Sequence, residues 1–201
     1  MILKRAIDIV ASALGLAILA IPMLAVAAWV RLDSAGPALY RQTRVGYKHR
    51  PFEILKYRTM RADGEGGSLT VGEDRRITRG GQALRKYKID ELPQLINVLA
   101  GDMSLVGPRP EVPEYASIYP EQALVWDSVR PGITDPTAIR FRNESALLAE
   151  ADDPEAYYRD VLLPEKTAGY LEYAERCSPV YDAKILVNTI WQVLRSPEGD
   201  A

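Results

Sequence analysis

The apolar positions of the chain are concentrated near its N-terminal end. From Ile9 to Val30 the sequence has no charged residue and consists mainly of Ala, Val, Ile and Leu. At a rise of about 1.5 Å per residue, such a helix could just cross a hydrocarbon core about 30 Å thick. A signal peptide fits poorly, because the run is too long and no clear cleavage site follows it. A buried core helix also fits poorly, because a helix apolar on every side is hard to cover in a small domain. We therefore expect a membrane segment.

Three features bear on whether this segment crosses the membrane or returns to the same side. Pro22 lies near the middle and removes a backbone hydrogen bond, so it is expected to kink or break the helix. Basic residues flank both ends, so the positive-inside bias favours neither orientation. Asp8 is expected to lie near the interface, because a carboxylate is costly in hydrocarbon. Two alternatives stay open, a kinked single-pass helix and a helix-break-helix hairpin that enters one leaflet and returns.

The remainder of the chain has the pattern of a water-facing domain. Leu39–Thr43 and Phe52–Tyr57 are expected to pair as a short β-hairpin around a turn that contains Gly46. Helices are expected over 77–87, 90–99, 154–173 and 182–194, and a mobile loop over 63–74. Two prolines exclude regular structure in Gly107–Pro110. The predicted fold class is α+β and mainly helical, with a re-entrant membrane hairpin over 1–35 and a small domain over 36–201.

The last predicted helix is amphipathic. Ile185, Ile190 and Leu194 recur at helical spacing, and Trp191 lies beside them. Packing against the core is the preferred interpretation. The alternative is an amphipathic helix that lies in the membrane interface, with Trp191 at headgroup level.

Composition narrows the chemistry that the domain can perform. The chain has 201 residues and a net charge of −2, which argues against a dedicated nucleic-acid binder. A single cysteine and a single histidine exclude an internal disulfide framework and a metal site rich in cysteine or histidine. Catalysis therefore has to rest mainly on Asp, Glu, Lys, Arg, Tyr or Ser.

Two adjacent carboxylates, Asp90 and Glu91, are the strongest candidates for chemistry. Pro93 is tolerated only in a first helical turn, so both acids are expected at or near a helix start. They could simply cap that helix and compensate its dipole. They could instead act on a phosphate, one carboxylate attacking phosphorus while the other holds Mg2+. A carboxylate nucleophile needs no base, which suits a chain with one histidine.

A reaction at phosphorus also needs cations for the phosphate oxygens. Basic residues gather between Lys56 and Arg109, and most of them are expected to be ordinary surface charges. Arg109 stands out because a proline on each side restricts where its side chain projects.

Four stretches closely resemble the bacterial sugar transferase family, the small monotopic polyprenyl-phosphate phosphoglycosyl transferases. They are Lys56–Met60, Asp90–Gln94, Asn97–Leu99 and Gly101–Pro110. The resemblance implies transfer of a phosphosugar from a UDP-sugar to a polyprenyl phosphate such as undecaprenyl phosphate, with release of UMP. This would be the first membrane step in the synthesis of a glycan such as an exopolysaccharide or O-antigen.

The resemblance also implies roles for single residues. It makes Asp90 the nucleophile of a covalent aspartyl-phosphosugar intermediate and Glu91 a ligand of Mg2+, and it places Lys56, Arg85 and Arg109 near the phosphates. It implies a monotopic protein on the cytoplasmic face of the bacterial inner membrane, in contact with lipid. A homodimer stays open. The family's membrane helix breaks at a Ser-Pro pair, whereas this chain has Ile21 before Pro22.

The stretch after Thr134 departs from many members of the family, so the identity of the sugar is not carried over. Two other functions stay open. A nucleotide-sugar glycosyltransferase could use Asp152 and Asp153 as a metal motif, although Pro154 makes that pair look like a helix start. It would release UDP instead of UMP. A catalytically silent membrane adaptor would release neither.

Overall fold

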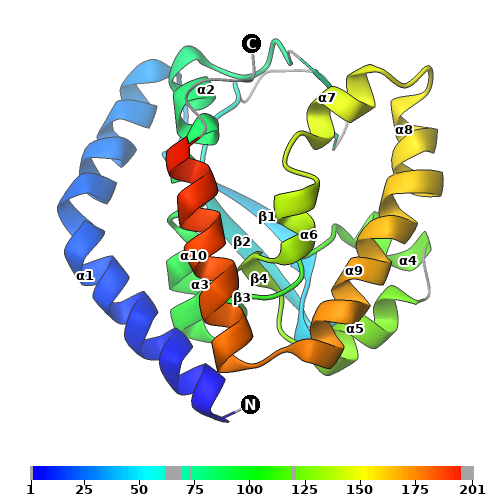
Figure 1. Cartoon of the computed structure of the whole chain (residues 1–201). Coiled ribbons are helices and arrows are strands. Elements are labelled where there is room, and N and C mark those ends of the chain that lie inside the picture. Colours follow the sequence, from blue (N-terminus) through cyan, green and yellow to red (C-terminus); the bar gives the residue numbers. More distant parts are fainter. Residues whose placement is uncertain (1, 62–68, 73, 119–120, 196–201) are drawn as a thin grey trace.

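The apolar N-terminal segment forms one helix, α1 (Ile2–Asp33), along one side of the molecule (Figure 1). The computed structural model describes residues 2–61, 69–72, 74–118 and 121–195. The helix continues through Pro22, so the predicted interruption into two helices is wrong. Figure 1 shows a bowed helix instead. A proline removes one hydrogen bond of the ladder, and the bonds on either side keep the two halves joined at an angle.

The surface of α1 is apolar and open. Among the described residues, α1 is the one helix long and apolar enough to cross a membrane, and only 6% of its most apolar window is buried. Ile18, Ile21 and Leu24 are each more than two thirds exposed. The helix is therefore not a core helix. An apolar surface of this size is typical of contact with lipid or with another protein.

Both ends of α1 are attached to the same body. Near the N-terminus, Lys4 pairs with Asp182, and Asp8 accepts hydrogen bonds from the Ser104 hydroxyl and the Leu105 N–H. Asp8 is thus buried against the domain, and its carboxylate is stabilised by protein hydrogen bonds. Near the other end, the Arg58 guanidinium donates to main-chain carbonyls of residues 30 and 34–37.

The predicted β-hairpin is confirmed. Strands β1 (Leu39–Val45) and β2 (Pro51–Tyr57) pair antiparallel, and a short helical turn over Tyr47–His49 joins them. On one face of β2, Ile54 packs with Val98 and Met103. On the other face, Tyr57 packs with residues of α1 and of the helix that follows the hairpin. Because both faces are covered, the hairpin is fixed between α1 and the rest of the domain.

A second, parallel pair of strands was not predicted. β3 (Ser104–Val106) pairs with β4 (Gly132–Thr134), and each strand has only three residues. The backbones come close where Gly107 faces Gly132, because a Cβ on Gly132 would lie 2.0 Å from the Gly107 nitrogen. Glycine is required there for steric reasons. This contact fixes the start of the loop that carries Arg109.

Helices make up most of the rest of the domain (Figure 1). The expected helix over 90–99 is divided, because a 3₁₀ turn over Ile89–Glu91 precedes Pro93 and the α-helix begins only after it. The expected helix over 154–173 contains a π-helical turn over Tyr158–Leu162. The loop predicted over 63–74 lies largely outside the described residues. The helices are α2 (Arg79–Lys86), α3 (Gln94–Ala100), α4 (Pro113–Ile118), α5 (Gln122–Ser128), α6 (Pro136–Arg140), α7 (Glu144–Ala149), α8 (Pro154–Tyr157), α9 (Leu163–Arg176) and α10 (Pro179–Arg195).

The last helix, α10, is only partly a core helix. Ile185 is buried against Val106 and Tyr173. Ile190 and Leu194 are more than half exposed, as are Val187 and Trp191 of the same helix. Core packing therefore accounts for one part of the apolar residues of α10 and leaves the rest open.

Candidate functional site

The two candidate carboxylates lie in the 3₁₀ turn between α2 and α3. Lys88, just before the turn, has a left-handed backbone conformation with φ 55°. The Glu91 N–H donates to the Lys88 carbonyl, and the Leu92 N–H donates to the Ile89 carbonyl. These bonds turn the chain sharply, so Asp90 and Glu91 contact β2 and do not cap α3.

Glu91 is held by cations from two other elements. Its Oε1 accepts from Lys56 Nζ of β2 at 2.8 Å and from Arg109 of the loop after β3 at 3.0 Å. Burial by itself raises the pKa of a carboxyl, but the charges of Lys56 and Arg109 outweigh it and hold the pKa of Glu91 well below its ordinary value. Glu91 is therefore ionised and fixed in one orientation.

Asp90 is buried beside Glu91, but it differs from Glu91 in its hydrogen bonding and in the direction of its pKa shift. Its Oδ1 is inaccessible to solvent and makes no hydrogen bond to any other described residue. Burial and the neighbouring charge of Glu91 raise its pKa, whereas Lys56, Lys88 and Arg85 oppose that rise. A buried carboxylate oxygen without a partner is costly, so its presence needs an explanation outside the packing of the fold.

The cations around the pair come from three separate elements. Burial and the charge of Arg109 lower the pKa of Lys56 to about 8. The charge of Glu91 raises the pKa of Arg109. Arg85 of α2 donates from Nε to the Thr59 hydroxyl at 2.8 Å, and burial lowers its pKa. The structure thus brings the predicted cations Lys56, Arg85 and Arg109 to the predicted carboxylates.

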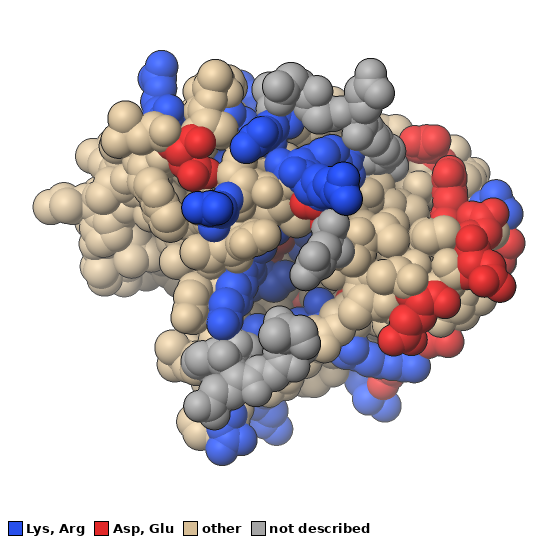
Figure 2. Space-filling model, turned by 90° about the horizontal axis from the view of Figure 1, so that it is seen from above, with Lys and Arg blue, Asp and Glu red and all other residues tan. Residues whose placement is uncertain are grey.

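Positive charge exceeds negative charge at this site. Two carboxylates face three buried or half-buried cations, so an anion can bind with favourable electrostatics. Figure 2 shows Lys and Arg side chains bordering a hollow near the centre of the upper face, whereas Asp and Glu gather along the edge formed by α7 and α8. The distribution favours a ligand with several negative charges.

The carboxylates also fit a magnesium ion that is shared with a phosphate ligand. The described residues contain no group of three or more acidic, histidine or cysteine side chains that could hold a metal by themselves. Mg2+ is commonly bound by one or two carboxylates together with substrate phosphates. Glu91 would supply the carboxylate of such a donor set.

Other candidates from the sequence have structural roles. Arg58 is buried on main-chain carbonyls, and Arg76 pairs with Asp74 at 2.6 Å. Asp153 caps α8 by accepting from two main-chain N–H groups. It therefore starts a helix, and the pair Asp152 and Asp153 is not needed as the metal motif of a glycosyltransferase. Pro22 belongs to α1 and takes no part in these contacts. Thr59 was missed as the group that positions Arg85, because a single threonine after a basic stretch carries no distinctive signal.

Comparisons with known proteins agree with this arrangement. The family model described as bacterial sugar transferase matches residues 1–196. The chain is 40% identical over 197 residues to a UDP-glucose:undecaprenyl-phosphate glucose-1-phosphate transferase of Caulobacter vibrioides, covering 95% of this chain and 69% of that protein. It is 36% identical over 216 residues to the exopolysaccharide production protein PSS of Rhizobium leguminosarum bv. phaseoli, covering 99% and 98%.

Some relatives are much longer than this chain and are named for other sugars. A UDP-N-acetylgalactosamine-undecaprenyl-phosphate N-acetylgalactosaminephosphotransferase of Aeromonas hydrophila is 41% identical over 137 residues, which cover 66% of this chain and 32% of that protein. The family model spans α1, the hairpin and every residue of the site. The chain belongs to the bacterial sugar transferase family.

Proposed function

We propose that this protein transfers a phosphosugar from a UDP-sugar to undecaprenyl phosphate or a similar polyprenyl phosphate, and releases UMP. The relatives named above as undecaprenyl-phosphate transferases support the substrate classes. The reaction would open the assembly of a membrane-linked glycan. The relatives are named for different sugars, so the proposal does not specify the sugar.

The observation that carries the proposal is the unpartnered Oδ1 of Asp90. Lys56 and Arg109 both bind Oε1 of Glu91, whereas Oδ1 of the adjacent Asp90 has no hydrogen-bond partner among the described residues. Burial raises the pKa of Asp90, which means that its ionised form is poorly stabilised by its surroundings and is a stronger nucleophile than a hydrated carboxylate.

The reaction takes place in two displacements at one phosphorus atom. The Asp90 carboxylate attacks the β-phosphorus of the UDP-sugar, the bond to the bridging oxygen of UMP breaks, and UMP leaves with that electron pair. A phosphate oxygen of the polyprenyl phosphate then attacks the same phosphorus. The acyl-phosphate bond breaks, the polyprenyl-diphosphate sugar leaves, and Asp90 is again a carboxylate.

The surrounding cations bind and orient the diphosphate. Lys56 and Arg109 bind Glu91, the residue next to the attacking carboxylate, and Arg85 is held by Thr59 from α2, so cations from three elements can neutralise negative charge on the diphosphate. Glu91, with Asp90 beside it, would hold Mg2+, which when bound neutralises further charge on the diphosphate.

We further propose that α1 enters and leaves one leaflet on the cytoplasmic side. The two ends of α1 are fixed to one domain by Lys4 and by Arg58, so they lie on the same side of a membrane that the domain does not cross. Figure 1 shows α1 bowed away from the domain, and Ile18, Ile21 and Leu24 of this helix are exposed. This arrangement would hold the site at the depth of the polyprenyl phosphate headgroup. Single cysteines placed at positions 3 and 34 of a Cys177→Ser protein should both react with a cytoplasmic reagent, and reaction from opposite sides would contradict the proposal.

The direct test of the reaction is an incubation of the purified protein with UDP-sugars, polyprenyl phosphate and Mg2+. We expect UMP release with at least one UDP-sugar, and no release by Asp90→Asn. Asp127→Asn, which changes an exposed carboxylate at the surface, should retain activity. Release of UDP would indicate a glycosyltransferase, and no product with any UDP-sugar would support an adaptor.

A further inference from the structure

The β-hairpin presents one aromatic side chain on the same face as Lys56. In the register of the hairpin, Tyr40 of β1 lies directly opposite Lys56 of β2. Directly opposed residues of an antiparallel pair project to the same face, with Cβ atoms about 5 Å apart. Lys56 reaches Glu91 at 2.8 Å, so Tyr40 stands at the border of the anion site.

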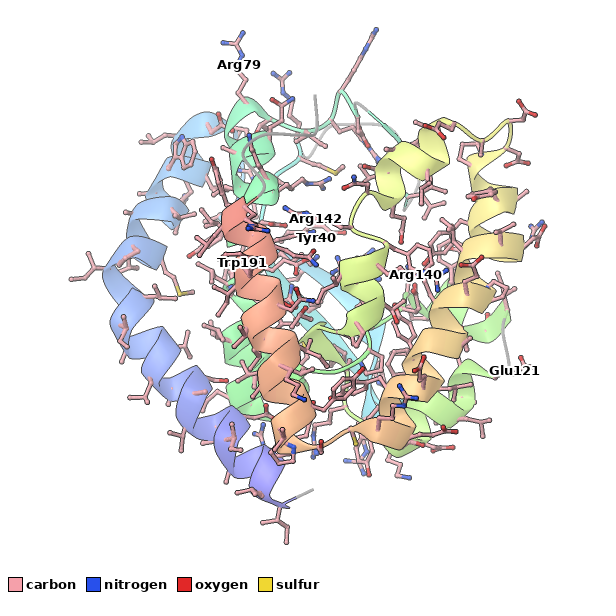
Figure 3. The ribbon with its side chains drawn as sticks, in the orientation of Figure 1. Tyr40, Arg79, Glu121, Arg140, Arg142 and Trp191 are labelled. Carbon is pink, nitrogen blue, oxygen red and sulfur yellow. The ribbon has the colours of Figure 1, made fainter. Side chains whose placement is uncertain are left out.

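Tyr40 is open where a structural tyrosine would be covered. It is 46% exposed, whereas Tyr57, next to Lys56 but on the opposite face of the hairpin, is 3% exposed and donates to the Met23 carbonyl. Within the described residues, the Tyr40 side chain makes no hydrogen bond and no ring contact, and its electrostatic neighbour is Arg44 of the same strand. In the view of Figure 3, Tyr40 lies toward the middle of the molecule. The packing of the fold therefore gives no reason for an aromatic ring at this position.

The nearest cation on the same face of β1, Arg44, is already bound by other groups of the protein. Arg44 lies on the same face of β1 as Tyr40, and its guanidinium donates to the Gln42 side chain at 2.6 Å and to the Pro110 carbonyl at 3.0 Å. It is thus fixed under the loop that carries Arg109. The exposed ring of Tyr40 remains available to a ligand.

We infer that Tyr40 stacks on the uracil ring of the UDP-sugar and forms one wall of the nucleotide site. This inference rests on the proposed function. In a nucleotide the ribose separates the base from the phosphates, so a group that binds the base should lie one sugar ring away from the groups that bind the phosphates. Tyr40 and Lys56, which lie side by side on one face of the hairpin, are separated by about that distance. Uracil is planar and uncharged, and an aromatic face is the surface that such a ring stacks on.

The test compares Tyr40→Ala with Tyr40→Phe. Loss of a base-stacking ring is worth about tenfold in binding. We expect Tyr40→Ala to raise the KM for the UDP-sugar and the inhibition constant of UMP by about tenfold, with a smaller change in kcat. Tyr40→Phe keeps the ring and should stay close to wild type. Thr43→Ala, on the other face of β1, controls for damage to the strand.

Two ligands separate base binding from phosphate binding. Inorganic pyrophosphate has no base, so its inhibition should be the same in Tyr40→Ala as in wild type. Equal weakening of UMP and pyrophosphate would overturn the inference, and so would a rise in KM for the polyprenyl phosphate alone. If the wild-type protein releases no UMP, the proposed function fails. If wild type releases UMP and Tyr40→Ala binds it normally, only the role of Tyr40 fails.

Discussion

Two buried ionic clusters of this protein share residue types and differ in completeness. The site cluster consists of Asp90, Glu91, Lys56, Arg85 and Arg109. The support cluster consists of Lys166, Glu111, Glu144 and Tyr158. In the support cluster, Lys166 donates to Glu144 at 3.0 Å and to Tyr158 at 3.1 Å, and Tyr158 donates to Glu111 at 3.0 Å.

The difference shows which cluster holds the fold and which is prepared for a ligand. Every member of the support cluster has a partner of opposite polarity, as expected where buried charges only connect helices. The site cluster has more positive than negative charge and leaves Asp90 Oδ1 without a partner. Glu111 follows Arg109 by two residues, so the complete cluster fixes the loop that supplies a cation to the incomplete one.

The largest expected effect is the loss of turnover when the Asp90 carboxylate is replaced. Asp90→Asn keeps the shape of the side chain but removes the nucleophile, so we expect turnover to fall by about a thousandfold or more. The stability of the protein should not fall, because the lost charge had no hydrogen-bond partner. Turnover is measured as UMP release and stability as the thermal midpoint in the same detergent. Substantial activity of Asp90→Asn would contradict the assignment of the site cluster to catalysis.

Breaking the support cluster should act on stability instead. Lys166→Met leaves the buried Glu111 and the half-buried Glu144 without their cation, which should cost about 3 kcal/mol of unfolding free energy. Denaturant unfolding followed by tryptophan fluorescence measures this loss, with the exposed Lys184→Met as control. Unchanged stability of Lys166→Met would show that the cluster is not structural.

Arg58 is a buried cation that belongs to neither cluster and holds the C-terminal end of α1. It binds main-chain carbonyls there and no carboxylate of the described residues. Arg58→Met should destabilise the protein by about 2–3 kcal/mol, because these carbonyls lose a charged donor. The folded fraction should retain its KM for the UDP-sugar. A selective rise in that KM would show that Arg58 contributes to binding of the UDP-sugar.

The smallest effect concerns pH. Lys56 is charged below its pKa of about 8 and neutral above it, so kcat/KM should fall as pH rises through about 8. Asp90 is ionised only above its raised pKa, so kcat/KM should also fall on the acidic side, at a higher pH than for an exposed aspartate. Lys56→Arg should remove the basic limb of the profile, because arginine keeps its charge. An unchanged limb in this variant would assign it to another group.

The elements that the sequence predicts correctly are those with strong local signals. The apolar run of α1 and the alternation of the hairpin both depend on residues close together in the chain. The carboxylates and cations of the site could also be named, because their types and family motifs are distinctive. Their contacts join residues 18 and 35 positions apart.

The features that the sequence does not predict depend on tertiary contacts. Three-residue strands such as β3 and β4 are too short for an alternating pattern, and the short helices α4 to α7 are too short for a helical one. Pro93 fits the first turn of an α-helix as well as the position just before it, where the structure has it, so the sequence did not show that Asp90 lies in a separate turn before α3. The hydrogen bonds of Asp8 with Ser104 and Leu105 could not be predicted, because these partners are about a hundred residues away in the chain.

The central claim is that Asp90 forms a covalent bond to the phosphorus of the donor. The most direct measurement is the intact mass of the purified protein after incubation with a UDP-sugar and Mg2+ in the absence of polyprenyl phosphate. We expect an added phosphosugar located on Asp90, which disappears when polyprenyl phosphate is added and never forms on Asp90→Asn. Multiple turnovers without any adduct, together with an active Asp90→Asn, would contradict the claim.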